Sequence, residues 1–186
     1  MLHVSQIAAA LGLPETAVND PARLGRDAAD VLGAWLSHLR ELDFDLVTRP
    51  TPSRGRSLRN LTVNVFHPFE LLPEAWKTGR FDWDPDRDAE REWQLVDAAS
   101  VVHFAERAAA GWGGFLHESG EALELSDRLV GTPRGEVAYS SLLDFQRWHA
   151  AYHYRQLVTF LRAEDATPER VLPLGSLDLA LPSDVY

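Results

Sequence analysis

Apolar residues recur at three- and four-residue steps along two long stretches of this chain, and this spacing predicts a helical fold. Side chains with this spacing lie on one face of an α-helix, where other helices can bury them. The first stretch, residues 21–46, carries Ala28, Val31, Leu32, Trp35, Leu39 and Leu42. The second begins near Ser140 or Ser141, continues past Leu161, and carries Leu142, Leu143, Phe145, Trp148, Tyr152, Leu157 and Phe160. We therefore expect an all-α protein.

Two further helices are expected between these stretches. Ser57 can cap a helix that runs from about residue 58 towards Phe66, where Pro68 removes a backbone donor and predicts a kink or a restart. Another helix should span residues 89–117, bent near the glycines of 111–114. The remaining segments read as a short helix at 4–12, loops at 48–56 and 78–88, a connection at 118–137 with an extended piece near 123–125, and a proline-containing C-terminal tail.

Length and charge limit the classes of function. A chain of 186 residues suits one domain, 1–186, that is large enough to bury a core. The formal net charge of -10 disfavours nucleic acid and anionic membranes as partners. No apolar run reaches the roughly 18 residues that span a bilayer, and the N-terminus has no cleavable leader, so a cytoplasmic protein is expected. The chain contains no cysteine, which excludes thiolate ligands and a cysteine nucleophile.

His149 and His153 are the strongest candidates for chemistry. They lie four residues apart on the last predicted helix, so both imidazoles project from one face and can reach one metal ion. Gln156 continues that face. The alternative is an ordinary polar stripe, but two buried imidazoles without a shared partner would be costly. Two ligands seldom hold a metal, so a third is needed.

The spacing of the histidines alone does not identify the third ligand. His67 lies in an apolar setting beside the predicted helix distortion, and His103 lies in an apolar helical stretch. Both residues therefore stay candidates for the third ligand at this point. The alternating acidic residues Asp82, Asp84, Asp86 and Asp88 are spaced like those of a calcium loop, but they lack its central glycine and its closing glutamate.

Two segments resemble the DinB/YfiT-like metal-dependent family, which includes thiol S-transferases and mycothiol-dependent maleylpyruvate isomerases. The segment from Arg56 to His67 resembles the family's second helix, entered through a capping serine. The segment from Gly135 to Gln156 resembles its closing helix, with the pattern H-x-x-x-H-x-x-Q at His149, His153 and Gln156. The resemblance implies a four-helix bundle over about residues 25–165, with an N-terminal extension at 1–24 and a C-terminal tail at 166–186.

The resemblance also implies a metal site and an activity. It makes His67, His149 and His153 the metal ligands and leaves His103 a core position. Three neutral imidazoles suit zinc, with nickel, iron or manganese as other possibilities, and leave an open position for a substrate. The implied enzyme activates a low-molecular-weight thiol, mycothiol or bacillithiol, for S-transfer to a small electrophilic substrate or for its isomerisation.

Three more residues receive roles under this resemblance. Gln156 would orient a ligand, Asn64 would hydrogen-bond behind the ligands, and Arg155 would meet a substrate carboxylate. A homodimer formed through apolar helix faces is expected. The alternatives are a metal-dependent hydrolase that uses metal-bound water, and a non-catalytic protein of the same fold that binds a metal or a small molecule.

Overall fold

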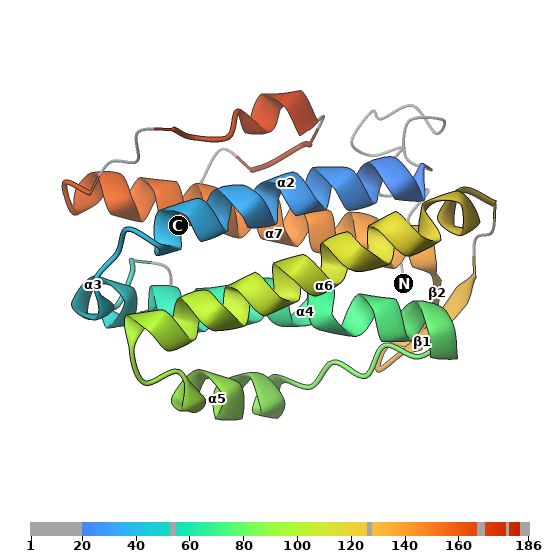
Figure 1. Cartoon of the computed structure of the whole chain (residues 1–186), viewed down its shortest axis with the longest axis horizontal. Coiled ribbons are helices and arrows are strands. Elements are labelled where there is room, and N and C mark those ends of the chain that lie inside the picture. Colours follow the sequence, from blue (N-terminus) through green and yellow to red (C-terminus); the bar gives the residue numbers. More distant parts are fainter. Residues whose placement is uncertain (1–19, 53–54, 126–127, 167–169, 178, 183–186) are drawn as a thin grey trace.

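The computed structural model describes residues 20–52, 55–125, 128–166, 170–177 and 179–182 (Figure 1). The short helix expected at residues 4–12 lies outside these ranges. The described residues form six α-helices, one antiparallel β-hairpin and one short 3-10 helix, η2 (Leu174–Leu177). The expectation of an all-α protein is therefore confirmed in its main part and corrected by the hairpin. No helix among the described residues is long and apolar enough to cross a membrane.

Four long helices surround the core: α2 (Pro21–Leu39), α4 (Leu58–Thr78), α6 (Ala98–Leu125) and α7 (Tyr139–Ala163). Helices α2 and α4 each pack against both α6 and α7 (Figure 1). Large aromatic side chains fill the space between them, and Trp35, Phe66, Phe69, Trp112 and Tyr154 are each less than 2% exposed. The apolar stripe predicted for α2 is buried as expected from Ala28 to Leu39. Its last member, Leu42, lies beyond the end of the helix and is partly buried.

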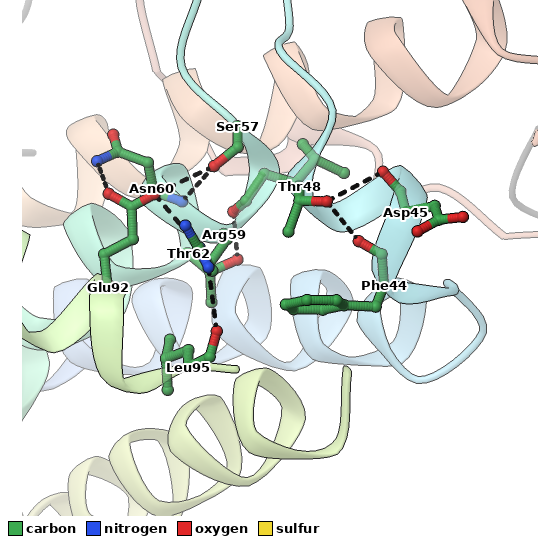
Figure 2. Close-up of polar contacts among 10 residues, drawn as sticks. Phe44, Asp45, Thr48, Ser57, Arg59, Asn60, Thr62, Glu92 and Leu95 are labelled. Atoms are coloured by element: carbon green, nitrogen blue, oxygen red, sulfur yellow. Dashed lines mark hydrogen bonds and ion pairs between the residues drawn. The ribbon is translucent and has the colours of Figure 1, made fainter. Parts of the chain in front are cut away.

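Two helices begin at capping side chains. Asp20 caps α2, where its side chain accepts a hydrogen bond from the backbone N–H of Arg23 at 3.0 Å. Ser57 caps α4 as predicted and accepts from the backbone N–H of Asn60 at 3.1 Å. Glu92 accepts hydrogen bonds from the Ser57 hydroxyl and the Asn60 amide, which ties the end of α5 (Pro85–Gln94) to the start of α4 (Figure 2).

Helix α4 corrects the expected kink or restart near Phe66. It continues through Pro68 and Pro73 to Thr78 and ends at Gly79, whose φ of 74° lies in the left-handed region. Pro68 cannot donate to the carbonyl of Asn64 one turn earlier. Burial of the surrounding turn offsets this loss, because His67, Pro68 and Phe69 are all buried. Packing thus outweighs the local preference of proline to end a helix.

Other boundaries also differ from expectation. The helix predicted over 21–46 is divided into α2 and α3 (Phe44–Thr48), and the one predicted over 89–117 is divided into α5 and α6. Helix α6 runs without a break past the glycines of 111–114. The predicted connection at 118–137 contains the end of α6 and the hairpin strands β1 (Leu129–Thr132) and β2 (Gly135–Ala138). The C-terminal tail contains η2.

The hairpin is joined to the segment that follows α4. Gly131 donates from its N–H to the carbonyl of Gly79 and accepts at its own carbonyl from the N–H of Phe81, each at 2.8 Å. These bonds form a short parallel bridge between Arg80 and Gly131. They hold residues 79–81 and β1 side by side next to the start of α7.

The two glycines of α2 give a test of how closely α2 and α6 pack. A Cβ at Gly25 would lie 2.5 Å from Leu116 Cδ2 and 3.3 Å from Trp112 Cζ2, whereas a Cβ at Gly33 would meet nothing within 4 Å. We expect Gly33→Ala to raise the free energy of unfolding by about 0.5–1 kcal/mol through helix propensity. Gly25→Ala should be about 1 kcal/mol less stable than Gly33→Ala because Leu116 must move. Urea unfolding measures both, and equal effects would contradict the close packing.

Buried His38 predicts a dependence of stability on pH. Its Nε2 lies 2.9 Å from the hydroxyl of Tyr154, which also accepts from the N–H of Leu172 at 3.0 Å. Burial lowers the pKa of His38 below 6.5, and the nearby charge of Glu41 opposes this only in part. At pH values between the folded and unfolded pKa of His38, the unfolded chain binds more protons than the folded chain. The contribution of His38 to the free energy of unfolding is therefore fully present above pH 6.5 and is lost as pH falls through the folded pKa.

We expect His38→Gln to flatten the fall in the free energy of unfolding below pH 6.5, because glutamine cannot acquire that proton. His103→Gln, at an exposed position of α6, is the matched control and should keep the wild-type slope. Urea unfolding at a series of pH values from 7.5 to 5 measures the slopes. The same slope in wild type and His38→Gln would contradict the contribution of His38 to this loss of stability.

Candidate metal centre

His149 and His153 face each other on α7, as their spacing predicts. Their Nε2 atoms are 3.1 Å apart, and their ring planes are inclined by 89°. Two imidazole nitrogens that share a tetrahedral zinc ion at about 2.0–2.1 Å are separated by roughly 3.3 Å. The pair therefore has nearly the spacing that one shared ion requires.

Both imidazoles are in the neutral form that can bind a metal. Burial lowers the pKa of His149 to about 3, with smaller contributions from His153 and from the positive charge of Arg56. Burial also lowers the pKa of His153, while its hydrogen bond to Gln156 opposes the shift. A neutral imidazole offers a lone pair, whereas an imidazolium does not. Arg56 would also repel a cation, so metal affinity would have to come from the nitrogen ligands.

Gln156 determines which nitrogen of His153 carries the lone pair. Its Oε1 lies 2.6 Å from His153 Nδ1, and only a protonated Nδ1 can donate to an amide oxygen. Nε2 is then the nitrogen with the lone pair, and it points towards His149. Gln156 is 3% exposed, so this hydrogen bond is protected from water. Its predicted role of orienting a ligand stays a prediction.

His67 is held by a carboxyl group that the sequence did not associate with it. Its Nδ1 donates to Asp88 Oδ1, and Asp88 Oδ2 accepts from Trp83 Nε1 at 3.1 Å. His67 is 2% exposed and Asp88 8%. A histidine that binds metal commonly donates its second N–H to a carboxylate in this way. In a neutral His67 imidazole this hydrogen bond leaves Nε2 as the nitrogen with a lone pair.

The structure brings together only two of the three predicted ligands. The described part of the chain contains no group of three or more histidine, aspartate or glutamate side chains that could hold one ion. His149 and His153 form the pair on α7, and His67 is bound to Asp88 on α5. The donor atoms of these residues fit a metal, while the approach of His67 to the pair stays a prediction.

A pocket opens beside His149. It has a volume of about 440 Å³ and lies between α4, the segment that follows it, the hairpin and the first half of α7. Aromatic side chains line much of it: Phe81, Trp83 and Phe145. Phe145 stacks on the imidazole of His149 with 6.1 Å between ring centroids and is 54% exposed. The pocket gives a small molecule access to one of the predicted ligands.

The other predicted site residues occupy different places. Asn64 lines the pocket, and its Oδ1 is buried without a hydrogen-bond partner. Arg155 does not line the pocket and donates from Nη2 to the carbonyl of Pro182 in the C-terminal segment. His103, expected in the core, is exposed on α6. That expectation was wrong because His103 lies on the outer face of α6, between the buried positions Val101 and Phe104.

Sequence reasoning missed Asp88, Trp83 and Arg134 as site residues. Asp88 stands in the acidic run that was compared with a calcium loop, and nothing in the run singles it out. Its burial depends on α5 folding back against α4, a long-range contact that no local pattern announces. Arg134 lies in the turn of the hairpin and lines the pocket, and the hairpin itself was not predicted.

Comparison with known proteins gives no match: no family model, no curated protein and no solved structure is similar to this chain.

Asp88→Asn tests the hydrogen bonds that hold His67. Asparagine has one carbonyl oxygen in place of two carboxyl oxygens, so either His67 Nδ1 or Trp83 Nε1 loses its acceptor. We expect the free energy of unfolding to fall by about 1–3 kcal/mol, the cost of a buried donor without a partner. The exposed Asp86, in the same helix, supplies the control Asp86→Asn. Urea unfolding that gives the same value for both variants would contradict the buried role of Asp88.

Proposed function

We propose that this protein is a divalent-metal-dependent enzyme that activates a low-molecular-weight thiol, mycothiol or bacillithiol, for S-transfer to a small electrophilic substrate or for isomerisation of that substrate. The observation that carries the proposal is the pair of neutral imidazoles on α7, with Nε2 atoms 3.1 Å apart beside an apolar pocket. This arrangement supports a metal centre with access for a substrate. The thiol chemistry rests on the family resemblance of the two helical segments.

His149, His153 and His67 would hold the ion, and zinc fits their nitrogen donors best. The bound ion would supply the positive charge that favours the deprotonated form of a thiol. The chain's own residues prepare the site: Gln156 fixes the tautomer of His153, and Asp88 fixes that of His67. Because the chain has no cysteine, the reacting sulfur would come from a cosubstrate.

A non-catalytic binding protein is the second candidate, and one observation favours it. Among the described residues only two histidines share a position suited to one ion, and Arg56 places a positive charge near them. A two-histidine site of this kind could bind a metal or a small molecule without catalysis. Metal analysis and a thiol assay separate the two candidates.

The first experiment measures zinc binding by isothermal titration calorimetry, with metal content checked by mass spectrometry. We expect one zinc ion per chain in the wild type. The affinity for zinc should fall at least 100-fold in His149→Gln, because this variant lacks one of the three predicted ligands. His103→Gln is the matched control, since His103 is exposed on α6. Absence of stoichiometric zinc in the wild type, or equal affinity in wild type and His149→Gln, would contradict the proposed metal centre.

The second experiment follows conjugation of monochlorobimane by fluorescence. We expect the zinc-loaded protein to accelerate the reaction in the presence of mycothiol or bacillithiol, and His149→Gln to remove that acceleration. His103→Gln should retain it. If zinc binds but neither thiol reacts faster, the binding-protein candidate is favoured. An acceleration that needs no added thiol would contradict the transferase.

A further inference from the structure

We propose that the pocket beside His149 takes an aromatic carboxylic acid that carries a hydrogen-bond donor on its ring, with the acid group at Arg134 and the donor group at Asn64. The inference rests on the proposed function in one respect: it takes this ligand to be the molecule on which the metal centre acts. The aromatic wall, the charged rim and the unpaired inner acceptor each support one part of the ligand.

The wall of the pocket suits a flat apolar body. Trp83 and Phe145 come from two separate elements, and a third aromatic side chain, Phe81, is almost fully buried behind the surface. The indole of Trp83 is held in place by its hydrogen bond to Asp88. Phe145 keeps about half of its surface exposed and lines the pocket. A volume of about 440 Å³ lies in the range of small-molecule sites.

The rim carries a positive charge. Arg134 lies at the turn between β1 and β2 and lines the pocket. Of its polar atoms, the backbone N–H donates to Thr132 Oγ1 at 3.1 Å, and within the described chain its guanidinium makes no ion pair. A planar guanidinium binds a carboxylate through two parallel hydrogen bonds. An acid group at the rim would therefore supply the partner that the protein itself does not.

The inner end of the pocket requires a donor. Asn64 Oδ1 is buried and accepts no hydrogen bond from the described residues. Pro68, one turn later and also lining the pocket, has no N–H for the backbone carbonyl of Asn64. The side-chain oxygen of Asn64 is thus short of a donor among the described residues. A hydroxyl or amino group on the ligand would satisfy an acceptor whose isolation is costly.

The experiment measures ligand binding to the full chain in buffer with EDTA, by isothermal titration calorimetry. The probes are 2-naphthoate, 2-naphthamide and 6-hydroxy-2-naphthoate. We expect 2-naphthoate to bind about fivefold more tightly than the uncharged amide, and Arg134→Gln to abolish this difference while leaving the affinity for the amide unchanged. Arg162→Gln is the matched control, because it removes the same charge at the exposed far end of α7.

The donor part has its own comparison. We expect 6-hydroxy-2-naphthoate to bind about fivefold more tightly than 2-naphthoate, and Asn64→Ala to reduce this gain. Circular dichroism checks that the variant is folded, and Asn64→Leu, which keeps a branched side chain of four heavy atoms, replaces it if it is not. No gain from the hydroxyl in the wild type, or a gain that persists in both folded Asn64 variants, would overturn the assignment to Asn64.

Other outcomes decide the remaining parts. Equal affinity for acid and amide in the wild type, or equal loss in Arg134→Gln and Arg162→Gln, would overturn the acid group. Failure of all three probes to bind would overturn the aromatic pocket. Because EDTA removes metal from this assay, its result is independent of the zinc titration. Binding of the probes without binding of zinc would support the proposed ligand class and contradict the metal centre. Binding of zinc without binding of the probes would support the metal centre and contradict the ligand class.

Discussion

The burial of α7 between α2 and α4 sets the chemistry of the two imidazoles that it carries. Contact with these helices hides the apolar side of α7, where His153 is buried and His149, one turn earlier, is half-buried beside the pocket. Removal of water disfavours the imidazolium form, so the pKa of His149 falls to about 3 and the pKa of His153 falls below its usual value. The hydrophobic packing that stabilises the fold therefore also favours the neutral form of two imidazoles whose Nε2 atoms share a hydrogen bond at 3.1 Å.

The local pattern of the sequence was sufficient for the interior of the helices and for the histidine pair. Burial from Ala28 to Leu39 and the facing of His149 and His153 follow from helical spacing, which involves only neighbours in the chain. Ser57 caps α4 as its position predicts. These features could be predicted because each depends on interactions over one or two helical turns.

Features that depend on distant contacts could not be predicted in this way. Proline normally ends a helix, but the packing around Pro68 outweighs this preference, and α4 continues for ten more residues to Thr78. The hairpin is held by bonds between Gly131 and the segment after α4, which lies about fifty residues earlier in the chain. Asp88 reaches His67 only because α5 folds back onto α4. The placement of His67 relative to the pair also depends on contacts between distant segments, and its role as the third ligand stays a prediction.

Asp88 links the wall of the pocket to the third predicted ligand. One of its oxygens accepts from Trp83, which lines the pocket, and the other accepts from His67. A ligand that moves the Trp83 indole must therefore also disturb the carboxyl group that orients His67. Trp83 in the pocket wall and His67 are thus joined by two hydrogen bonds to a single buried side chain.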